Sequence, residues 1–352
     1  MNNLKKVLFI LIFLIKGVFS FSQIGGDNTY EFLNLTNSAR VASLGGNQIS
    51  IKDNDLNFVF HNPALLNAEM DKHIVLNYVN YFADINYYYV AYAQKFDSIG
   101  NFAFGIHHIN YGDFQGANEN GQKTKKFSSS EYAFNLFYSR EILDSLFTVG
   151  VNLKPIYSVL ENYMSYGISS DFGITYNNIK KLFTASFVLK NIGTQIKPYY
   201  SSHYEDLPFD IQIGITKKLE KAPFRFSFLF HHLNKLDMTY KNPNEKNKDN
   251  FFEEKTEKDE EIWWEDSGDK ILRHFILGIE FLPSDNFFIS AGYNYQRREE
   301  LKLETKSGMT GISFGFGVRI SRFQFSYARA IYHVAGASNH FSFSVNFNKK
   351  RL

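Results

Sequence analysis

The stretch Ile312–Ile320 reads ISFGFGVRI, and Phe323–Tyr327 follows after two residues as FQFSY. In both stretches every second residue is aliphatic or aromatic, and the residues between them are mostly small or polar. A period of two is typical of a β-strand whose two faces meet different surroundings. The stretch Phe341–Phe347, FSFSVNF, repeats the pattern. These segments predict an all-β chain built from two-sided strands.

The same alternation recurs from His73 to the C-terminus. We count fourteen such stretches, which start near His73, Ile85, Asn101, Phe127, Phe147, Ser165, Lys181, Pro208, Pro223, Arg273, Asn286, Met309, Arg322 and Asn339. A soluble sandwich also alternates, but its exposed face is usually charged and its strands average about 5–6 residues. Here one face is strongly aromatic and the strands run to about ten residues or more, which is typical of an outer-membrane β-barrel. We therefore predict a transmembrane antiparallel barrel over residues 73–352.

The connections between the predicted strands alternate in length. Short ones include Asp97–Gly100 and Glu141–Ser145, and long ones include Gly112–Lys126 and Leu233–Leu272. A barrel with short periplasmic turns, long surface loops and both termini in the periplasm has this rhythm. Pro155 lies inside the fifth strand, where we expect a bulge or a break because proline lacks the N–H of the ladder.

Composition narrows the class further. The 352 residues carry a net charge of +2, contain no cysteine, and include 37 Phe and 22 Tyr. The charge gives no reason to expect a nucleic-acid partner. The missing cysteine excludes disulfides, thiolate metal sites and a cysteine nucleophile. Beyond the N-terminus no apolar run approaches the ~20 residues of a membrane helix.

The first 22 residues have the features of an export signal. Lys5 and Lys6 precede the apolar run Val7–Ile15, and Ser20 and Ser22 occupy the small-residue positions of a cleavage site. A short membrane anchor is the alternative, but nine apolar residues are too few to span a bilayer. We predict a signal peptide over residues 1–22 and an outer-membrane location in a Gram-negative bacterium.

Residues 23–72 precede the first strand and lack its rhythm. The segment mixes the glycine pairs at positions 25–26 and 45–46 with short apolar runs such as Phe58–Leu66. A fourteen-stranded barrel is wide enough to need a filled lumen. We therefore expect an N-terminal plug over 23–72, with a flexible periplasmic tail as the alternative.

The insert Leu233–Leu272 is acidic. Between Glu253 and Asp269 it holds nine acids against two lysines, and it contains the only tryptophans, Trp263 and Trp264. A solvated surface loop is the ordinary interpretation of a charge run. Because tryptophan is enriched at interface hot spots, this pair is our candidate partner-binding site. Calcium binding is a weaker alternative, since no EF-hand-like spacing is present.

Searches for chemistry give no catalytic site, metal site or cofactor. Gly311–Gly315 matches G-x-S-x-G, but the serine lies in a strand and not at a strand-to-helix elbow. The pairs at positions 107–108 and 231–232 are both His-His. Neighbours on a strand point to opposite faces, so we expect neither pair to chelate a metal by itself. We predict that the protein is not an enzyme.

Several segments resemble the PorQ family of outer-membrane proteins of the type IX secretion system of Bacteroidota. The likeness rests on the order of motifs along the chain, beginning with Tyr30–Leu35, Ser38–Arg40, Leu44–Asn47 and His61–Leu66. The element His61, Asn62, Pro63 and Ala64 also resembles the N-terminal hatch of FadL-type fatty-acid transporters, which are fourteen-stranded barrels. The acidic tryptophan insert departs from the family pattern.

The resemblance implies a non-enzymatic role in the cell-surface attachment complex. A PorQ-like barrel would hold a PorZ-like surface protein, with the sortase PorU and with PorV in the same complex, among outer-membrane lipid and lipopolysaccharide. The main alternative is a FadL-like transporter of hydrophobic small molecules, which would need a lateral opening and an apolar pocket near the hatch. A barrel phospholipase is a third hypothesis, which would need a Ser–His pair within hydrogen-bond reach.

Overall fold

The computed structural model describes residues 28–143, 145–201, 203–239, 268–301, 308–333 and 336–348. The chain forms two compact units, one of residues 28–234 with 271–352 and one of residues 1–27 with 235–270. In the second unit the described part is short, and there Lys270 Nζ lies 3.1 Å from Asp237 Oδ2. The predicted signal peptide and both Trp263 and Trp264 lie outside the described residues.

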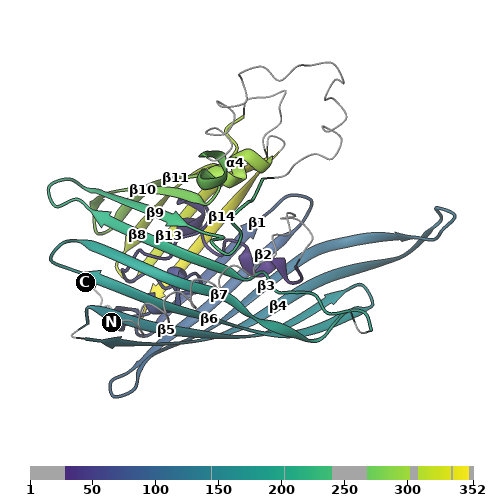
Figure 1. Cartoon of the computed structure of the whole chain (residues 1–352), viewed down its shortest axis with the longest axis horizontal. Coiled ribbons are helices and arrows are strands. Elements are labelled where there is room, and N and C mark those ends of the chain that lie inside the picture. The colour runs from purple at the N-terminus through teal and green to yellow at the C-terminus, as the bar shows by residue number, and fades with distance from the viewer. Residues whose placement is uncertain are drawn as a thin grey trace, which may run out of the picture. The chain divides into compact units, whose positions relative to one another are not determined.

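The larger unit is a closed barrel of antiparallel strands in chain order, in which β1 also pairs with β14 (Figure 1). The strands are β1 (His73–Asn80), β2 (Asn86–Phe96), β3 (Gly100–Ala117), β4 (Lys123–Ile142), β5 (Phe147–Leu160), β6 (Tyr163–Asn178), β7 (Phe183–Lys197), β8 (Asp210–Lys218), β9 (Phe224–Phe230), β10 (Phe275–Ser284), β11 (Phe287–Asn294), β12 (Ile312–Ile320), β13 (Phe323–His333) and β14 (Gly336–Asn346). The predicted barrel and its fourteen strands are confirmed, and each predicted start lies within four residues of the observed one.

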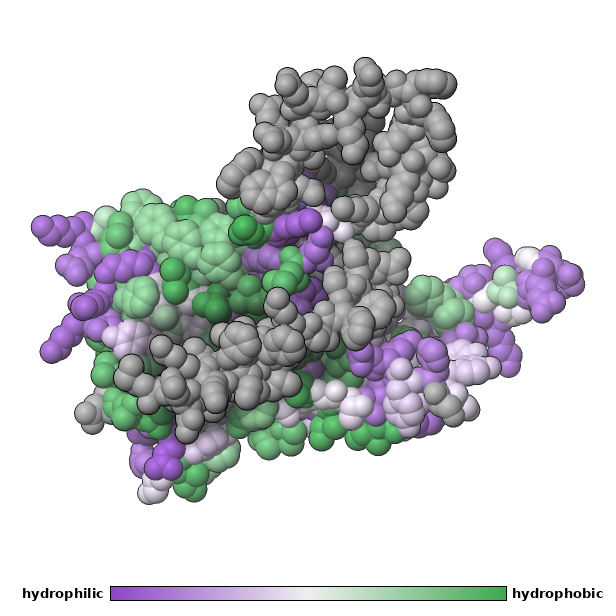
Figure 2. All heavy atoms as spheres, viewed as in Figure 1, coloured by the Kyte–Doolittle hydropathy of each residue, from purple (hydrophilic) through white to green (hydrophobic). Residues whose placement is uncertain are grey.

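Outward-facing side chains of the barrel are mainly apolar, and Figure 2 shows hydrophobic residues gathered over the strands and hydrophilic residues at the strand ends. A row of aromatic rings crosses nine neighbouring strands with ring centroids 4.2–6.3 Å apart: Phe316, Tyr327, Phe341, Tyr78, Tyr88, His108, Tyr132, Tyr157 and Tyr166. Adjacent members face each other directly across the ladder. Such cross-strand pairs stabilise a sheet. Because barrel strands tilt, this row climbs along the wall and does not mark one level.

The two ends of the barrel differ. We call the end that carries the short connections 97–99, 285–286 and 321–322 the turn end, and the opposite end the loop end. His73 at the start of β1 pairs with Asn346 at the end of β14, so the first strand begins and the last strand ends at the turn end. An even number of strands requires this. That the turn end faces the periplasm stays a prediction.

One local expectation needs correction and another is confirmed. The predicted long loop Gly112–Lys126 is mostly a strand hairpin that projects beyond its neighbours (Figure 1), and only residues 118–122 connect β3 to β4. Most side chains of this hairpin are exposed on both faces. Its sequence is therefore polar at successive positions and lacks the apolar–polar alternation of the other strands. The bulge or break expected at Pro155 is confirmed as a break, since the β4–β5 pairing is interrupted there and the register on either side is unchanged.

Residues 28–72, which we call the hatch segment, precede the barrel as short helical turns. They are η2 (Glu31–Asn34), α2 (Ala39–Ser43), η3 (Leu56–Phe60), η4 (Pro63–Leu65) and η5 (Ala68–Met70). Four of these turns are capped by the side chain before them, namely Ser38, Asp55, Asn62 and Asn67. Among the described residues, no helix is long and apolar enough to cross a membrane.

The hatch segment packs against inward-facing residues of many strands. Ser139 Oγ of β4 donates to the Leu66 carbonyl at 2.7 Å, and Ser50 Oγ lies 2.7 Å from Thr216 Oγ1 of β8. On the other side of the lumen the Ala39 N–H donates to Ser342 of β14 at 2.9 Å. The small and polar inner face of the strands therefore surrounds a largely buried hatch segment.

Candidate functional site

The hatch residues singled out from the sequence lie together and are buried. The His61 ring nitrogens lie 3.0 Å from the side-chain oxygens of Asn47 and Asn37. Burial lowers the pKa of His61, so its ring is neutral at pH 7 and donates to only one of these two oxygens. Asn62 caps η4 by accepting from the Ala64 N–H at 2.9 Å. Asn62 therefore stabilises the local structure of the hatch segment.

The wall of the barrel is shaped to receive this turn. Gly150 of β5 and Gly173 of β6 pair directly and both face the lumen. A Cβ at Gly150 would lie 2.3 Å from the Ala64 nitrogen, and one at Gly173 would lie 2.2 Å from Asn62 Oδ1. Asn62 also donates from Nδ2 to Thr175 Oγ1 of β6 at 3.0 Å. The Asn-Pro-Ala turn therefore sits on a pair of glycines, because no side chain would leave it room.

A buried ion cluster ties the hatch segment to the opposite wall. Arg40 of α2 lies 2.7 Å from Asp53, 3.2 Å from Asp55 and 2.9 Å from Glu280 of β10. Arg225 of β9 completes the cluster by pairing with Glu280 at 2.5 Å and Asp53 at 3.3 Å. Burial alone would raise the pKa of Asp53, but Arg40 and Arg225 outweigh it and lower that pKa to about 2. The carboxylate is therefore ionised across the physiological range.

The rings of two aromatic residues enclose the guanidinium of this cluster. Arg40 Cζ lies 4.9 Å from the Phe58 ring centre and 4.8 Å from that of Phe288. Removing a partner from a buried ion cluster costs more than removing an exposed pair, because it leaves an uncompensated charge. The cluster therefore holds the hatch in one position. On its solvent side a polar cavity of about 480 Å³ opens at the turn end, and Arg319 and Lys218 also line it.

An apolar cavity of about 210 Å³ lies at the loop end, between the start of the hatch segment and the first three strands. Glu31 and Arg297 also line it. The other lining residues are mainly aromatic and aliphatic, namely Phe32, Leu35, Val79, Tyr81, Ile85, Tyr87, Ile109 and Tyr111. Phe32, Val79 and Ile109 are almost completely buried and belong to one hydrophobic cluster. An apolar cavity with charged groups beside it suits a small, mostly hydrophobic molecule.

One serine and one histidine lie within hydrogen-bond distance, as the phospholipase hypothesis requires. Ser338 Oγ lies 2.9 Å from His340 Nε2, both on β14. Both side chains are buried, and Ser338 also lies within 3.5 Å of the Ala330 carbonyl. Neither residue lines the two cavities described above. A hydrolase needs an accessible nucleophile, so this pair gives no support to the phospholipase hypothesis.

The two histidine pairs behave differently from each other. His107 is fully buried on the inner face while His108 stacks between Tyr88 and Tyr132 on the outer face, so the expected split is confirmed there. For His231 and His232 the expectation is wrong. Strand β9 ends at Phe230, and His232 has φ 54°, so the two rings are not on opposite faces but lie 4.7 Å apart.

Several residues that build this site were not singled out from the sequence. Gly150 and Gly173 carried a usable signal, because glycine inside a strand often marks a close backbone approach. Glu280 also carried a usable signal, because it is a carboxylate at a position of the strand that faces inward. Arg40 was noted only within the family resemblance, because its partner Glu280 lies 240 residues away in the chain.

No protein-family model matches the chain, and a search of curated proteins gives no match. Among solved structures the chain is similar to the CymD monoaromatic hydrocarbon channel, with 13% identity and a TM-score of 0.51 over 89% of this chain and 98% of that one. It is also similar to the toluene transporter TodX of Pseudomonas putida, with 11% identity and a TM-score of 0.50 over 88% and 97%. A FadL homologue of Pseudomonas aeruginosa aligns with 11% identity and a TM-score of 0.44 over 88% and 97%.

At these identities the likeness concerns the fold and not the activity. This chain has a closed antiparallel sheet in chain order and short helical turns that precede β1. The chain therefore has the fold of the CymD and TodX channels, a fourteen-stranded antiparallel β-barrel with an N-terminal helical and turn segment before the barrel.

Proposed function

We propose that the protein is a non-enzymatic outer-membrane barrel that takes up a small hydrophobic molecule through the apolar cavity at its loop end. A closed barrel with an apolar outer face suits a bilayer, because every strand edge is paired and the wall buries no unpaired backbone group in lipid. The cavity is the observation that carries the proposal, since it lies beside the hatch segment, where the transporter hypothesis requires an apolar pocket.

The size of the cavity favours a single-ring compound. An apolar cavity of about 150 Å³ in another protein binds benzene, so about 210 Å³ accommodates a ring with a small substituent. Glu31 and Arg297 offer polar contacts to a substituent on such a ring. The printed descriptions of CymD and TodX name monoaromatic hydrocarbons and toluene, which agrees with a ligand of this class.

Filling the cavity tests the proposal. Val79 lines it from β1 and is 1% exposed, whereas Val90 faces outward from β2 and is 38% exposed. We expect Val79→Phe to lower the accumulation of labelled toluene in intact cells toward that of cells lacking the protein, and Val90→Phe to leave it unchanged. Heat-modifiable migration on gels verifies that both variants assemble. Equal accumulation with and without the wild-type protein would exclude uptake of toluene.

A second candidate function is the surface mount implied by the PorQ-like resemblance. In this role the barrel anchors a PorZ-like protein of the type IX secretion system, with PorU and PorV, beside lipopolysaccharide. Two observations favour it: the ion cluster around Arg40 fixes the hatch segment, and the hairpin of β3 and β4 projects from the loop end (Figure 1). A fixed barrel with a projecting, hydrogen-bonded arm is a suitable support for a partner.

The two candidate functions respond to different changes. If the barrel is a mount, Trp263→Ala with Trp264→Ala, or deletion of residues 113–126, reduces the partner protein retained on the cell surface, and Val79→Phe does not. If it is a transporter, the loop changes are silent and Val79→Phe lowers uptake. Normal partner retention in cells that lack the whole protein would eliminate the mount, whatever the uptake assay gives.

A further inference from the structure

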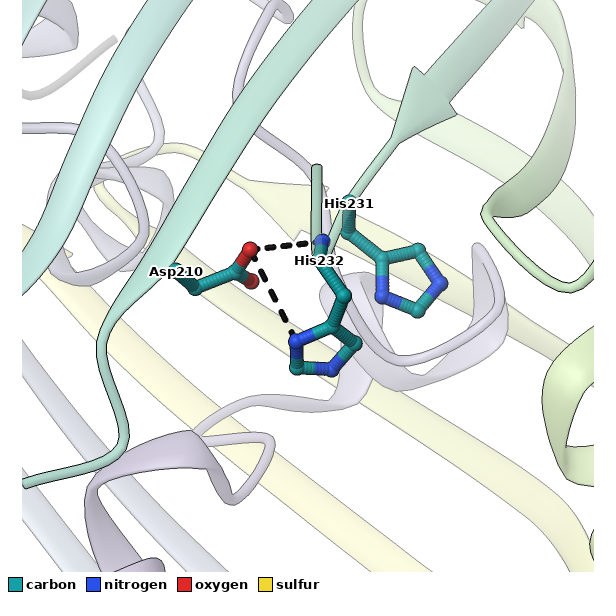
Figure 3. Close-up of side chains that lie close together, drawn as sticks. All are labelled: Asp210, His231 and His232. Carbon is teal, nitrogen blue, oxygen red and sulfur yellow. Dashed lines mark hydrogen bonds and ion pairs between the residues drawn. The ribbon is translucent and has the colours of Figure 1, made fainter. Parts of the chain in front are cut away.

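Three side chains that neither candidate function uses meet at the loop end. Asp210 is the first residue of β8, and His231 and His232 directly follow β9. Figure 3 shows the three side chains close together. Each offers one ligand atom, and these atoms lie within 4.8 Å of one another. Among the described residues this is the group of at least three His and acidic side chains with the spacing of a metal site.

The backbone explains why adjacent histidines converge. Beyond Phe230 the chain leaves the strand, and the left-handed conformation of His232 turns its side chain back toward that of His231. The His232 N–H donates to Asp210 Oδ1 at 2.6 Å, and the His232 ring nitrogen Nδ1 lies 3.7 Å from the same oxygen. Strand β8 thus supplies the carboxylate, and the end of β9 supplies both imidazoles.

Two of the three side chains are buried. Asp210 is 2% exposed and His231 is 4% exposed. In Figure 3 the ring nitrogen Nδ1 of His231 faces Asp210 and His232, whereas Nε2, which is buried without a hydrogen-bond partner, points away from them. Asp210 accepts from Gln212 and from His232, and an ionised carboxylate has further lone pairs.

We propose that Asp210, His231 and His232 form a binding site for one divalent transition-metal ion of the Zn²⁺ class. Two imidazoles and a carboxylate favour Zn²⁺, Ni²⁺ or Cu²⁺ over Ca²⁺ and Mg²⁺, which prefer sets made only of oxygen ligands. Three protein ligands leave a fourth position for water. The side chain of His232 is 26% exposed, which gives an ion access from solvent.

The site stands where the chain leaves the barrel for the acidic insert. His232 directly precedes Leu233, and on the return His274 follows the insert by two residues. The His231 N–H donates to the His274 carbonyl at 3.0 Å, and His274 Nδ1 lies 2.8 Å from the His231 carbonyl. An ion on His231 and His232 would therefore fix both ends of the insert to β8. This inference is independent of the proposed function.

Metal titration of the full-length, untagged protein in detergent tests the site. After chelator treatment, calorimetry with Zn²⁺ should show one saturable site per chain. Asp210→Asn keeps the hydrogen bond from the His232 N–H, and His232→Asn suits the left-handed backbone. Each of these variants, and His231→Gln, should weaken Zn²⁺ binding at least about tenfold. His108→Gln on the outer face is the matched control and should bind as the wild type does.

Co²⁺ supplies a readout that does not depend on the variants. Bound by imidazoles in a site of low coordination number, it should give visible d–d absorption that Zn²⁺ abolishes. Absence of that absorption in the wild-type protein, or Zn²⁺ affinity unchanged in all three variants, would overturn the proposal. Binding that survives in the three variants but is lost in His108→Gln would place the ion elsewhere.

Discussion

At the scale of single residues, Arg40 joins the hatch segment to the barrel. It contacts two carboxylates from its own segment, Asp53 and Asp55, and one from the wall, Glu280. Because these contacts are ion pairs, the position of the hatch depends on the charge of the carboxylates, which changes with pH. The relevant carboxyl is Asp53, whose pKa is lowered to about 2.

Acid should release the hatch. A group whose pKa is lowered on folding stabilises the fold fully above its ordinary pKa, here 3.8, and loses that contribution as the pH falls toward about 2. We expect single-channel conductance in planar bilayers to stay low from pH 7 to pH 5 and to rise below pH 4. Asp53→Asn should conduct more at neutral pH and lose the acid step. Asp97→Asn, at an exposed turn, should match the wild type, and an acid step that persists without Asp53 would assign it to other carboxyls.

Some of the residues that build the site could be predicted from the sequence. His61, Asn62, Pro63 and Ala64 were selected as a hatch motif, and they do lie together in the structure. Whether they serve transport stays a prediction. The Arg40 cluster was not predicted, because an ion pair between residues far apart in the chain leaves no periodic signal.

At the scale of elements, strands were predictable because a wall between lipid and lumen imposes a period of two on every strand. The prediction failed where that wall ends. The outer parts of β3 and β4 are exposed on both faces, so polarity there looked like a loop. The prediction for the turn after β9 failed for a different reason. His232 adopts a left-handed backbone conformation, which the hydropathy pattern does not indicate.

The fit between the η4 turn and the glycine pair can be tested with one methyl group. Gly150→Ala places a Cβ 2.3 Å from backbone atoms of Pro63 and Ala64, so the hatch must shift. Overpacking of this kind typically costs about 1–3 kcal/mol. We expect the barrel to assemble, but with a lower unfolding midpoint in detergent and greater permeability to small solutes. Gly268→Ala, which meets no atom within 4 Å, is the control. Wild-type permeability and midpoint in Gly150→Ala would mean that the turn does not seal the lumen.

At the scale of the whole molecule, the barrel places the short connections 97–99, 285–286 and 321–322 at the same end as the start of its first strand and the end of its last strand. If the turn end faces the periplasm, the acidic insert faces the outside of the cell. Protease added to intact cells should therefore cut within Glu253–Asp269 and spare Asp97–Gly100. Lysed cells show whether each site is cleavable at all. Cleavage of intact cells only at Asp97–Gly100 would reverse the assigned orientation.

The hatch segment also constrains the order of events when the protein is made. It reaches β4, β8 and β14 with its own hydrogen bonds and is surrounded by a ring of strands with no free edge. A folded segment of this size does not pass through a finished wall. It is joined covalently to β1, whose pairing with β14 is the one pairing between strands that are not consecutive in the chain. We therefore expect the hatch to fold inside an open, curved sheet, and the pairing of β1 with β14 to come last. In that view the hatch is a template around which the assembly machinery closes the wall.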